Sequence, residues 1–151
     1  MRIGIGADHA GYALKEQIKS MLPELGAEVV DYGTGAETSV DYPEFGFAVA
    51  EAVTAAHCDR GLLICKSGIG MSIVANKVLG IRAGLCYDAE AARLCRAHND
   101  CNVLVLGAAW VDAGQAREII RVWLETAFEG GRHLRRLEKI MNFERDRSSA
   151  G

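Results

Sequence analysis

The sequence lacks the features by which several large classes of protein are recognised. No apolar run approaches the roughly 20 residues that a membrane-spanning helix needs. Basic residues are not in excess, since 17 lysines and arginines face 20 aspartates and glutamates and leave a formal net charge of −3. A nucleic-acid-binding protein normally has a basic surface. We therefore expect a protein that binds neither membranes nor nucleic acids.

Cysteine is present, but not in a pattern that binds metal or forms a disulfide framework. The five cysteines are odd in number, and no two of them are spaced as C-x-x-C. Histidines and carboxylates add no metal-ligand spacing to them. The chain also opens directly on a strand pattern, so we expect no signal peptide. We expect reduced and mostly buried thiols in a cytoplasmic protein with no bound metal.

Two familiar phosphate-binding loops are incomplete. A cysteine phosphatase needs Cys-x5-Arg, and Met71 stands at the arginine position that follows Cys65. A dinucleotide-binding fold needs G-x-G-x-x-G after its first strand, and His9 replaces the third glycine. Asp31 ends the second predicted strand, where a ribose-binding acid would lie, but it is a weak signal alone. We expect no nucleotide and no other cofactor.

Short apolar runs rich in branched residues alternate with amphipathic stretches, which is typical of repeated strand–helix units. The patterns predict strands over residues 2–7, 28–31, 61–65, 81–85 and 102–106. They predict helices over residues 11–22, 44–56, 70–78, 89–97 and 113–126. We predict a single α/β domain over residues 1–151, a three-layer Rossmann-like sandwich whose open parallel sheet carries helices on both faces.

A last amphipathic segment, residues 132–147, follows a pair of glycines. Leu134, Leu137 and Ile140 recur in it at helical spacing. A helix added after a completed α/β layer has little left to cover in its own subunit, so we predict a dimerisation helix. A helix folded back on its own domain is the alternative. We expect residues 148–151 to be a frayed end.

The loop after the third predicted strand is the most informative part of the chain. Gly68 and Gly70 lead into a helix and let backbone N–H groups converge on one point, as in sites that bind phosphate or stabilise a charged oxygen. Cys65 stands at the entrance of this loop, near a helix start and beside Lys66. Both features favour its thiolate. The alternative is a buried cysteine above a tight turn.

Two further pairs of polar residues adjoin predicted strands. Asp8 and His9 follow the first strand, and the alternative for Asp8 is a helix cap. His98 and Asn99 come just before the fifth strand. An ionisable histidine can move protons near neutral pH, and the alternative is again a cap, at the helix end. We group all four with the loop after the third strand as candidate site residues.

Arg132 and Arg136 are four residues apart, so they share one face of the last predicted helix. Paired guanidinium groups on one face suit a phosphate. The alternative is a basic face that points into solvent.

Taken together, these motifs resemble ribose-5-phosphate isomerase type B and its relatives, the galactose-6-phosphate and allose-6-phosphate isomerases. The motifs are G-x-D-H-A-G-x-x-L-K at residues 6–15, V-D-Y-P at 40–43, C-x-S-G-I-G-M-S-I-x-A-N-K at 65–77, G-I-R-A at 80–83, R-x-H-N-D at 96–100 and E-G-G-R-H at 129–133. The match runs nearly the whole chain. The resemblance implies a parallel sheet with the strand order 2-1-3-5-4. It also implies a homodimer, often paired into a homotetramer, in which each active site is shared between subunits.

The resemblance also implies roles for individual residues. The base falls on Cys65, and the histidine that opens the sugar ring falls on His98, with help from Asp8. Ser67 is placed to hydrogen-bond near the thiolate, which completes the catalytic set. The residues expected to bind the phosphosugar are Asp8, His9, Tyr42, Lys66, Ser67, Gly68, Ile69, Gly70, Asn99, Arg132 and Arg136.

The chain departs from the family's pattern at two positions. Ala109 stands where an arginine usually helps to hold the phosphate, and Lys66 stands where a glycine usually follows the cysteine. Our hypothesis is that Lys66 partly replaces the missing positive charge. A lysine that points into solvent is the alternative. These departures leave phosphate affinity and sugar length open.

The sequence therefore predicts a metal-independent enzyme that interconverts ribose 5-phosphate and ribulose 5-phosphate through an enediolate, with a cysteine base. An isomerase of allose 6-phosphate, galactose 6-phosphate or another phosphosugar is the first alternative. A phosphosugar-binding module without activity is the second, suggested by Ala109 and Lys66.

Overall fold

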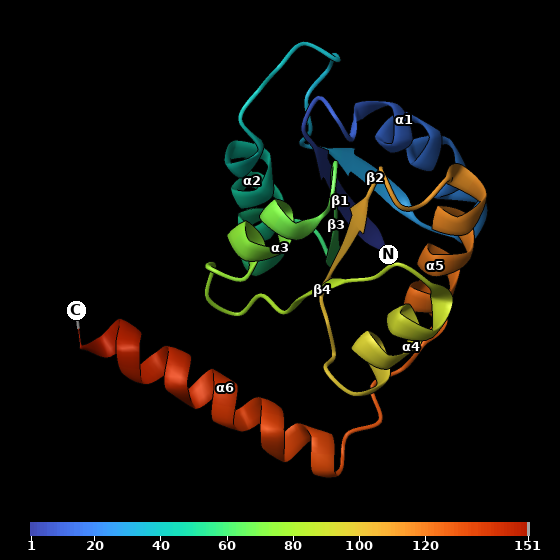
Figure 1. The fold of residues 1–151 in the computed structure, drawn as a ribbon. Helices are drawn as coiled ribbons and strands as arrows, with labels where there is room; N and C mark the ends of the chain where they lie inside the picture. The colour runs from blue at the N-terminus through green and yellow to red at the C-terminus, as the bar shows by residue number, and fades with distance from the viewer. Residues whose placement is uncertain (151) are drawn as a thin grey trace.

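The computed structural model describes residues 1–150, and a sheet of parallel strands forms its centre (Figure 1). The strands are β1 Arg2–Ala7, β2 Glu28–Asp31, β3 Arg60–Cys65, β4 Ala83–Leu85 and β5 Val103–Gly107. They are hydrogen-bonded in the order β2-β1-β3-β5-β4, and each neighbouring pair is parallel. The predicted α/β class and the strand order are confirmed.

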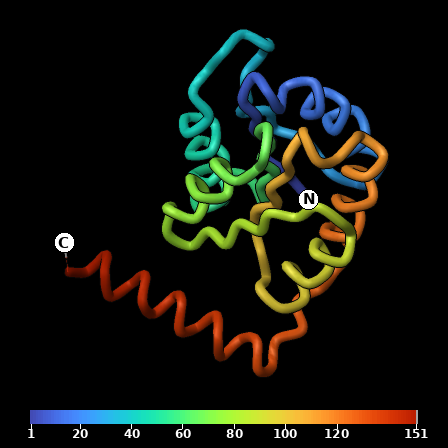
Figure 2. Tube along the Cα trace, in the orientation of Figure 1, coloured from blue at the N-terminus to red at the C-terminus, as the bar shows by residue number. Residues whose placement is uncertain are grey.

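Helices cover both faces of the sheet (Figures 1 and 2). They are α1 Tyr12–Met21, α2 Tyr42–Thr54, α3 Ile69–Ala75, α4 Ala89–Ala97, α5 Ala113–Glu125 and α6 Arg132–Ser149, with a short 3-10 helix, η1, at Pro23–Leu25. α2 and α3 pack on one face, whereas α1, α4 and α5 pack on the other. α6 runs past the body of the domain, and its C-terminal end lies apart from the other helices (Figure 1).

The central strands are buried on both sides because successive side chains point to opposite faces of the sheet. In β3, Leu62 and Ile64 join the core under α1 and α5, while Leu63 and Cys65 join the core under α2 and α3. β5 alternates in the same way, with its leucines on one face and its valines on the other. Burial on both faces explains why these strands read as continuous apolar runs in the sequence.

Backbone contacts tie together the carboxyl ends of the central strands. The N–H groups of Ala108 and Ala109, after β5, donate to the carbonyls of Cys65 and Lys66, both at 2.9 Å. The turn after β1 comes so close to β3 that a Cβ atom on Gly11 would lie 2.6 Å from the carbonyl oxygen of Ile64. The edge at which open parallel sheets bind ligands is therefore held together by backbone contacts.

The end of α3 and the start of β4 differ from their predictions for a local reason. α3 stops at Ala75 and β4 starts at Ala83, instead of at residues 78 and 81. The Asn76 side chain forms two hydrogen bonds with the backbone of Ala83. Its Oδ1 accepts from the N–H of Ala83 at 2.9 Å, and its Nδ2 donates to the Ala83 carbonyl at 3.0 Å. The N–H of Arg82 likewise donates to Oδ1 of Asn102. Side-chain amides thus satisfy backbone groups that the hydrophobic pattern had assigned to regular elements.

α6 is longer than predicted and only partly covered. It runs to Ser149, so the expected frayed end over residues 148–151 is wrong at 148 and 149, and Gly151 lies outside the described residues. Leu137 is buried, whereas Leu134, Ile140 and Phe143 are exposed. Neither α6 nor any other helix within residues 1–150 is long and apolar enough to cross a membrane.

Replacing Gly11 with alanine is expected to destabilise the fold. The new Cβ would clash with the Ile64 carbonyl, a backbone group that cannot move away by a change of rotamer. Overpacking of this kind costs about 1–3 kcal/mol. Gly35→Ala is the matched control, because a Cβ atom there meets nothing within 4 Å. Urea unfolding measures both free energies, and equal values would show that the turn after β1 shifts without cost.

Candidate active site

Cys65 ends β3 at the carboxyl edge of the sheet. The residue is only 5% exposed, and its Sγ accepts a hydrogen bond from the N–H of Gly68 at 3.2 Å. An N–H group aimed at a sulfur stabilises negative charge on it. The sulfur is therefore buried, as in the alternative of a cysteine above a tight turn. It is also held beside the N–H of Gly68, and a thiolate base requires such a donor.

The loop that follows Cys65 is shaped by its glycines. Gly68 has a φ of +78°, a backbone conformation that other residues rarely adopt. A Cβ atom on Gly70 would lie 2.8 Å from the ring of Tyr42, which places Tyr42 against the loop. Ser67 Oγ accepts from the N–H of Ile69 at 3.2 Å. The structure thus places Tyr42 against the predicted loop, whose Gly68 N–H faces the sulfur.

Asp8 and His9 follow β1 at the same edge. Asp8 is buried, and its Oδ1 accepts from the N–H of Gly11 at 3.0 Å. Gly11 itself caps α1, so Asp8 holds the turn before the helix and is not its cap. His9 Nδ1 accepts from the N–H of Val40 at 3.2 Å, which leaves Nε2 as the nitrogen that carries the proton in a neutral ring. His9 therefore joins the loop before α2 to the site.

The remaining predicted residues lie at the opposite edge of the sheet: His98, Asn99, Arg132 and Arg136. α4 runs back from the carboxyl edge, so His98, which caps its C-terminal end, lies near the amino end of β5. Cys65 pairs in register with Gly107, at the carboxyl end of β5. The length of that strand, about 13 Å at ~3.3 Å per residue, separates the two groups. His98 and Asn99 therefore lie at the amino edge of the sheet, apart from the loop that follows Cys65 in the same chain.

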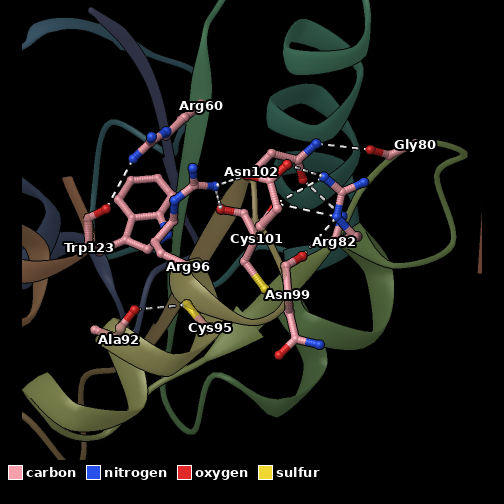
Figure 3. Close-up of polar contacts among 11 residues, drawn as sticks. Arg60, Gly80, Arg82, Ala92, Cys95, Arg96, Asn99, Cys101, Asn102 and Trp123 are labelled. Atoms are coloured by element: carbon pink, nitrogen blue, oxygen red, sulfur yellow. Dashed lines mark hydrogen bonds and ion pairs between the residues drawn. The ribbon is translucent and has the colours of Figure 1, made fainter. Parts of the chain in front are cut away.

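Two arginines to which the sequence analysis gave no role hold the turn that follows α4 (Figure 3). Arg82 Nε donates to the Asn99 carbonyl at 2.9 Å, and its Nη2 lies 3.0 Å from Oδ2 of Asp100. Arg96 is buried, and its Nη1 lies 2.8 Å from Oδ1 of Asp100. Asp100 has a φ of +45°, which is uncommon for a residue with a side chain. Both arginines belong to motifs quoted above, and that was the signal available in the sequence.

His98 stacks on His133, the second residue of α6. The ring centroids are 4.2 Å apart and the ring planes differ by 12°. Oε2 of Glu129 lies 3.5 Å from Nε2 of His133 and 3.9 Å from Nε2 of His98. Burial, with the positive charges of His98 and Arg132, lowers the pKa of His133 below its usual value, although Glu129 opposes the shift. Neither His133 nor Glu129 was predicted, because no periodicity links them to His98.

Within residues 1–150, His98, Glu129 and His133 form the group that could hold a metal ion. Their ligand atoms all lie within 4.8 Å of one another. An imidazole nitrogen binds zinc along its lone pair, in the plane of the ring, at about 2.0–2.1 Å. The rings of His98 and His133 are stacked and nearly parallel, so their lone pairs do not converge on one ion. The arrangement fits two stacked imidazoles beside a carboxylate better than it fits a metal centre.

A cleft of about 470 Å³ lies between α6 and β4, beside the group that contains His98. Arg82, Asn99 and Glu144 give it polar walls, and Leu137 and Ile140 give it an apolar one. Such a mixed lining suits a side chain or loop from another molecule as well as a small ligand.

Asp31 is engaged in ion pairs. The Nζ atoms of Lys15 and Lys19 lie 2.6 and 2.7 Å from its Oδ2. Burial opposes ionisation of Asp31, but hydrogen bonds from the two lysines outweigh it and lower its pKa. Lys15 is itself almost fully buried, so Asp31 serves as its counter-ion and not as an acceptor for a ribose.

The other cysteines are placed as small core residues. All five thiols are free; Cys58, Cys86 and Cys101 are buried like Cys65, and Cys95 is partly buried. A hydrogen bond with Cys95, together with burial, raises the pKa of Cys101. A thiol that resists ionisation is a poor base, so Cys65 is the thiol best placed for chemistry.

Known proteins match the chain over nearly its whole length. A family model described as Ribose/Galactose Isomerase matches residues 3–140. The structure of ribose-5-phosphate isomerase B from Clostridium thermocellum is 51% identical, with a TM-score of 0.94 over 97% of this chain and 99% of that one. Ribose-5-phosphate isomerase B of Escherichia coli is 44% identical over 97% of this chain and 99% of that protein. D-erythrulose-4-phosphate isomerase of Pectobacterium atrosepticum is 42% identical over 95% of each.

Proposed function

The chain belongs to the ribose/galactose isomerase family of aldose–ketose isomerases that act on sugar phosphates, and from this premise we propose that it interconverts ribose 5-phosphate and ribulose 5-phosphate. The reaction relocates protons and needs a base, an acid and a stabiliser of negative charge. The observation that carries the proposal is the environment of Cys65, whose sulfur faces the N–H of Gly68 at 3.2 Å in a glycine-rich loop.

The first stage opens the furanose ring. The hydroxyl proton on C1 must leave while the ring oxygen gains a proton, so that the C1 aldehyde forms. His98 suits this transfer because an imidazole exchanges protons near neutral pH. Asp8, buried at the carboxyl edge, assists it. Since Asp8 and His98 lie at opposite edges of one chain, His98 of the partner subunit must act beside Asp8.

The second stage moves the carbonyl group. The Cys65 thiolate removes the proton from C2; the released electrons form a C1–C2 double bond, and the carbonyl electrons move to O1. N–H groups of residues 67–71 stabilise this enediolate, and one such donor typically contributes about 3 kcal/mol. The hydroxyl proton on O2 then passes to O1, Cys65 returns its proton to C1, and C2 becomes the carbonyl carbon of the ketose.

Two subunits supply each site in this proposal, with α6 as the dimerisation helix. One subunit gives Cys65 and the loops around it, and the other gives His98, Asn99, Arg132 and Arg136. Uncovered apolar residues support the pairing: Ile69 and Ile73 on α3 are 54% and 55% exposed, and α6 carries its own exposed apolar side chains. The cleft beside α6 offers room for part of the partner. Pairing of two such dimers into a tetramer would leave the sites unchanged.

The phosphate would be held by Arg132 and Arg136, with Lys66 taking the place of an arginine after β5. The N–H of Ala109 donates to the Lys66 carbonyl at 2.9 Å, so these positions are neighbours. Lys66 is exposed, and its flexible stem can carry a charge into the space that an arginine at position 109 would occupy. We propose that the two departures from the family's pattern compensate for each other.

A different phosphosugar is the second candidate, favoured by the relative that is named for a four-carbon sugar phosphate. The family description also names galactose, so allose 6-phosphate and galactose 6-phosphate stay in consideration. A binding module without activity remains the third. We place the protein in the cytoplasm, where a reducing environment would keep its five thiols free.

Ribose 5-phosphate is expected to give the highest kcat/KM in a panel that includes allose 6-phosphate, galactose 6-phosphate and erythrose 4-phosphate. The reason is that the phosphate must reach Arg132 and Arg136 while C1 and C2 lie beside Cys65, so the length of the sugar must match the distance between these groups. Product formation in deuterated water, followed by NMR, measures both the rate and the proton transfer. A different leading sugar would correct the substrate, and binding without turnover or deuterium uptake would leave only the binding module.

Cys65→Ala is expected to lower kcat on the best substrate at least ~100-fold, because a general base contributes about 10²–10⁴-fold. The Tm should change little beyond the loss of one buried thiol. Cys86→Ala is the matched control, since Cys86 is also buried and lies on the other face of the sheet. A Cys65→Ala enzyme that kept its rate would remove this sulfur from the mechanism.

Shared sites predict complementation between two inactive variants. In a mixed dimer of Cys65→Ala and His98→Ala subunits, one site carries both lesions and the other carries none. Random exchange makes half of the dimers mixed, so refolding an equimolar mixture should recover about one quarter of the unmodified activity. Each variant refolded alone is the control. A mixture as inactive as its components would mean that Cys65 and His98 do not act from different subunits.

A further inference from the structure

The contact between His98 and His133 is fixed by the backbone on both sides of it. The N–H of Glu129 donates to the carbonyl of Ala97 at 3.0 Å, which attaches the segment before α6 to the end of α4. The chain then turns through Gly130, with a φ of +66°, and the N–H of His133 donates back to the Gly130 carbonyl at 3.0 Å. The start of α6 therefore delivers the His133 ring onto His98.

The two stacked rings differ in their access to solvent. The side chain of His98 is 35% exposed and that of His133 is 8% exposed, while Glu129 is 53% exposed. His98 is thus the outer ring, able to meet a substrate, and His133 is the inner ring, closed off behind it. This placement leaves His133 little access to a substrate, so we expect it to act through His98.

The stack with the inner ring restrains the orientation of the His98 ring. The second side-chain torsion of a histidine has a broad energy profile, so a free imidazole at a helix end samples many ring planes. Proton transfer requires a group held within about 10–20° of its productive orientation. Stacking at 4.2 Å with planes 12° apart restricts the His98 ring to one plane.

Charged groups surround the pair of rings. Burial lowers the pKa of His133, which favours the neutral form of the inner ring. The charged groups that face the pair are Glu90 on α4, Glu129 before α6, and Arg132 and Arg136 on α6. Of the two carboxylates, Glu129 lies 3.9 Å from Nε2 of His98. A cation above a neutral aromatic face is also favourable.

We propose that His133 and Glu129 are positioning residues for His98: the buried ring fixes the plane of the outer ring, and the carboxylate stabilises the proton that the outer ring carries. The proposal rests on the proposed function, because it takes His98 to be the group that opens the sugar ring.

The test compares two aldoses that differ in their need for ring opening. Ribose 5-phosphate closes into a furanose, whereas erythrose 4-phosphate cannot, because its phosphate occupies the oxygen that would close a five-membered ring. His133→Ala is expected to lower kcat on ribose 5-phosphate about 10–100-fold with less than a ~3-fold change in KM, part of the usual acid–base contribution. Its kcat on erythrose 4-phosphate should stay within about 2-fold of the unmodified enzyme.

His133→Phe separates orientation from titration, because phenylalanine keeps a flat ring against His98 and should restore most of the rate. Glu129→Gln should move the limb of the pH–rate profile that belongs to His98 toward lower pH, since the imidazolium loses its counter-ion. Glu138→Gln, at an exposed position of α6, and His57→Ala, at an exposed surface position, are the matched controls. Equal losses on both aldoses, or no loss from His133→Ala, would overturn the positioning role.

An NMR titration tests the same contacts without any substrate. The His98 ring proton between the two nitrogens should lose its ring-current shift in His133→Ala and keep one in His133→Phe. Its titration midpoint should fall in Glu129→Gln and not in Glu138→Gln. Unchanged shifts and midpoints would overturn the proposal, whatever the enzyme does. If the spectra change as expected while ribose 5-phosphate is not a substrate, the positioning contacts stand and the proposed function fails.

Discussion

All strands of this sheet run in one direction, and that constraint decides where chemistry can occur. The strands end together at one edge, and the helices that return from them end together at the other. Cys65, Asp8 and His9 follow strands, whereas His98 and Asn99 follow a helix. No rotamer change brings residues from one edge to the other, because a packed core lies between them. A site that needs both groups needs two chains.

Each edge is stiffened by a different kind of contact. At the carboxyl edge, backbone groups bond to backbone groups, and glycines permit approaches that a side chain would block. At the amino edge, charged side chains hold the turn after α4, since Arg82 and Arg96 both pair with Asp100. The first kind of contact suits a loop that must present N–H groups. The second suits a turn that presents ionisable side chains, because it sets their electrostatic surroundings as well as their position.

Much of the fold could be predicted because the strands and helices follow the hydrophobic pattern. The boundaries that failed are those where Asn76 and Asn102 satisfy backbone groups with side-chain amides, a choice that leaves no periodic trace. The loop that follows Cys65 could be predicted because its residues are contiguous in the sequence. The stack of His98 on His133 could not, since it depends on how α6 leaves α5. The separation of His98 from Cys65 within one chain also follows from the fold, because His98 caps the returning helix α4 and so lies near the amino end of β5.

The separation of Cys65 from His98 along β5 has a consequence for how the protein responds to its own abundance. If neither edge works alone, monomers are inactive, and the activity is proportional to the concentration of dimers. At protein concentrations well below the dissociation constant of the dimer, the dimer concentration grows with the square of the total concentration. A modest rise in gene expression would then produce a disproportionate rise in flux, and dilution by cell growth would lower the flux just as steeply.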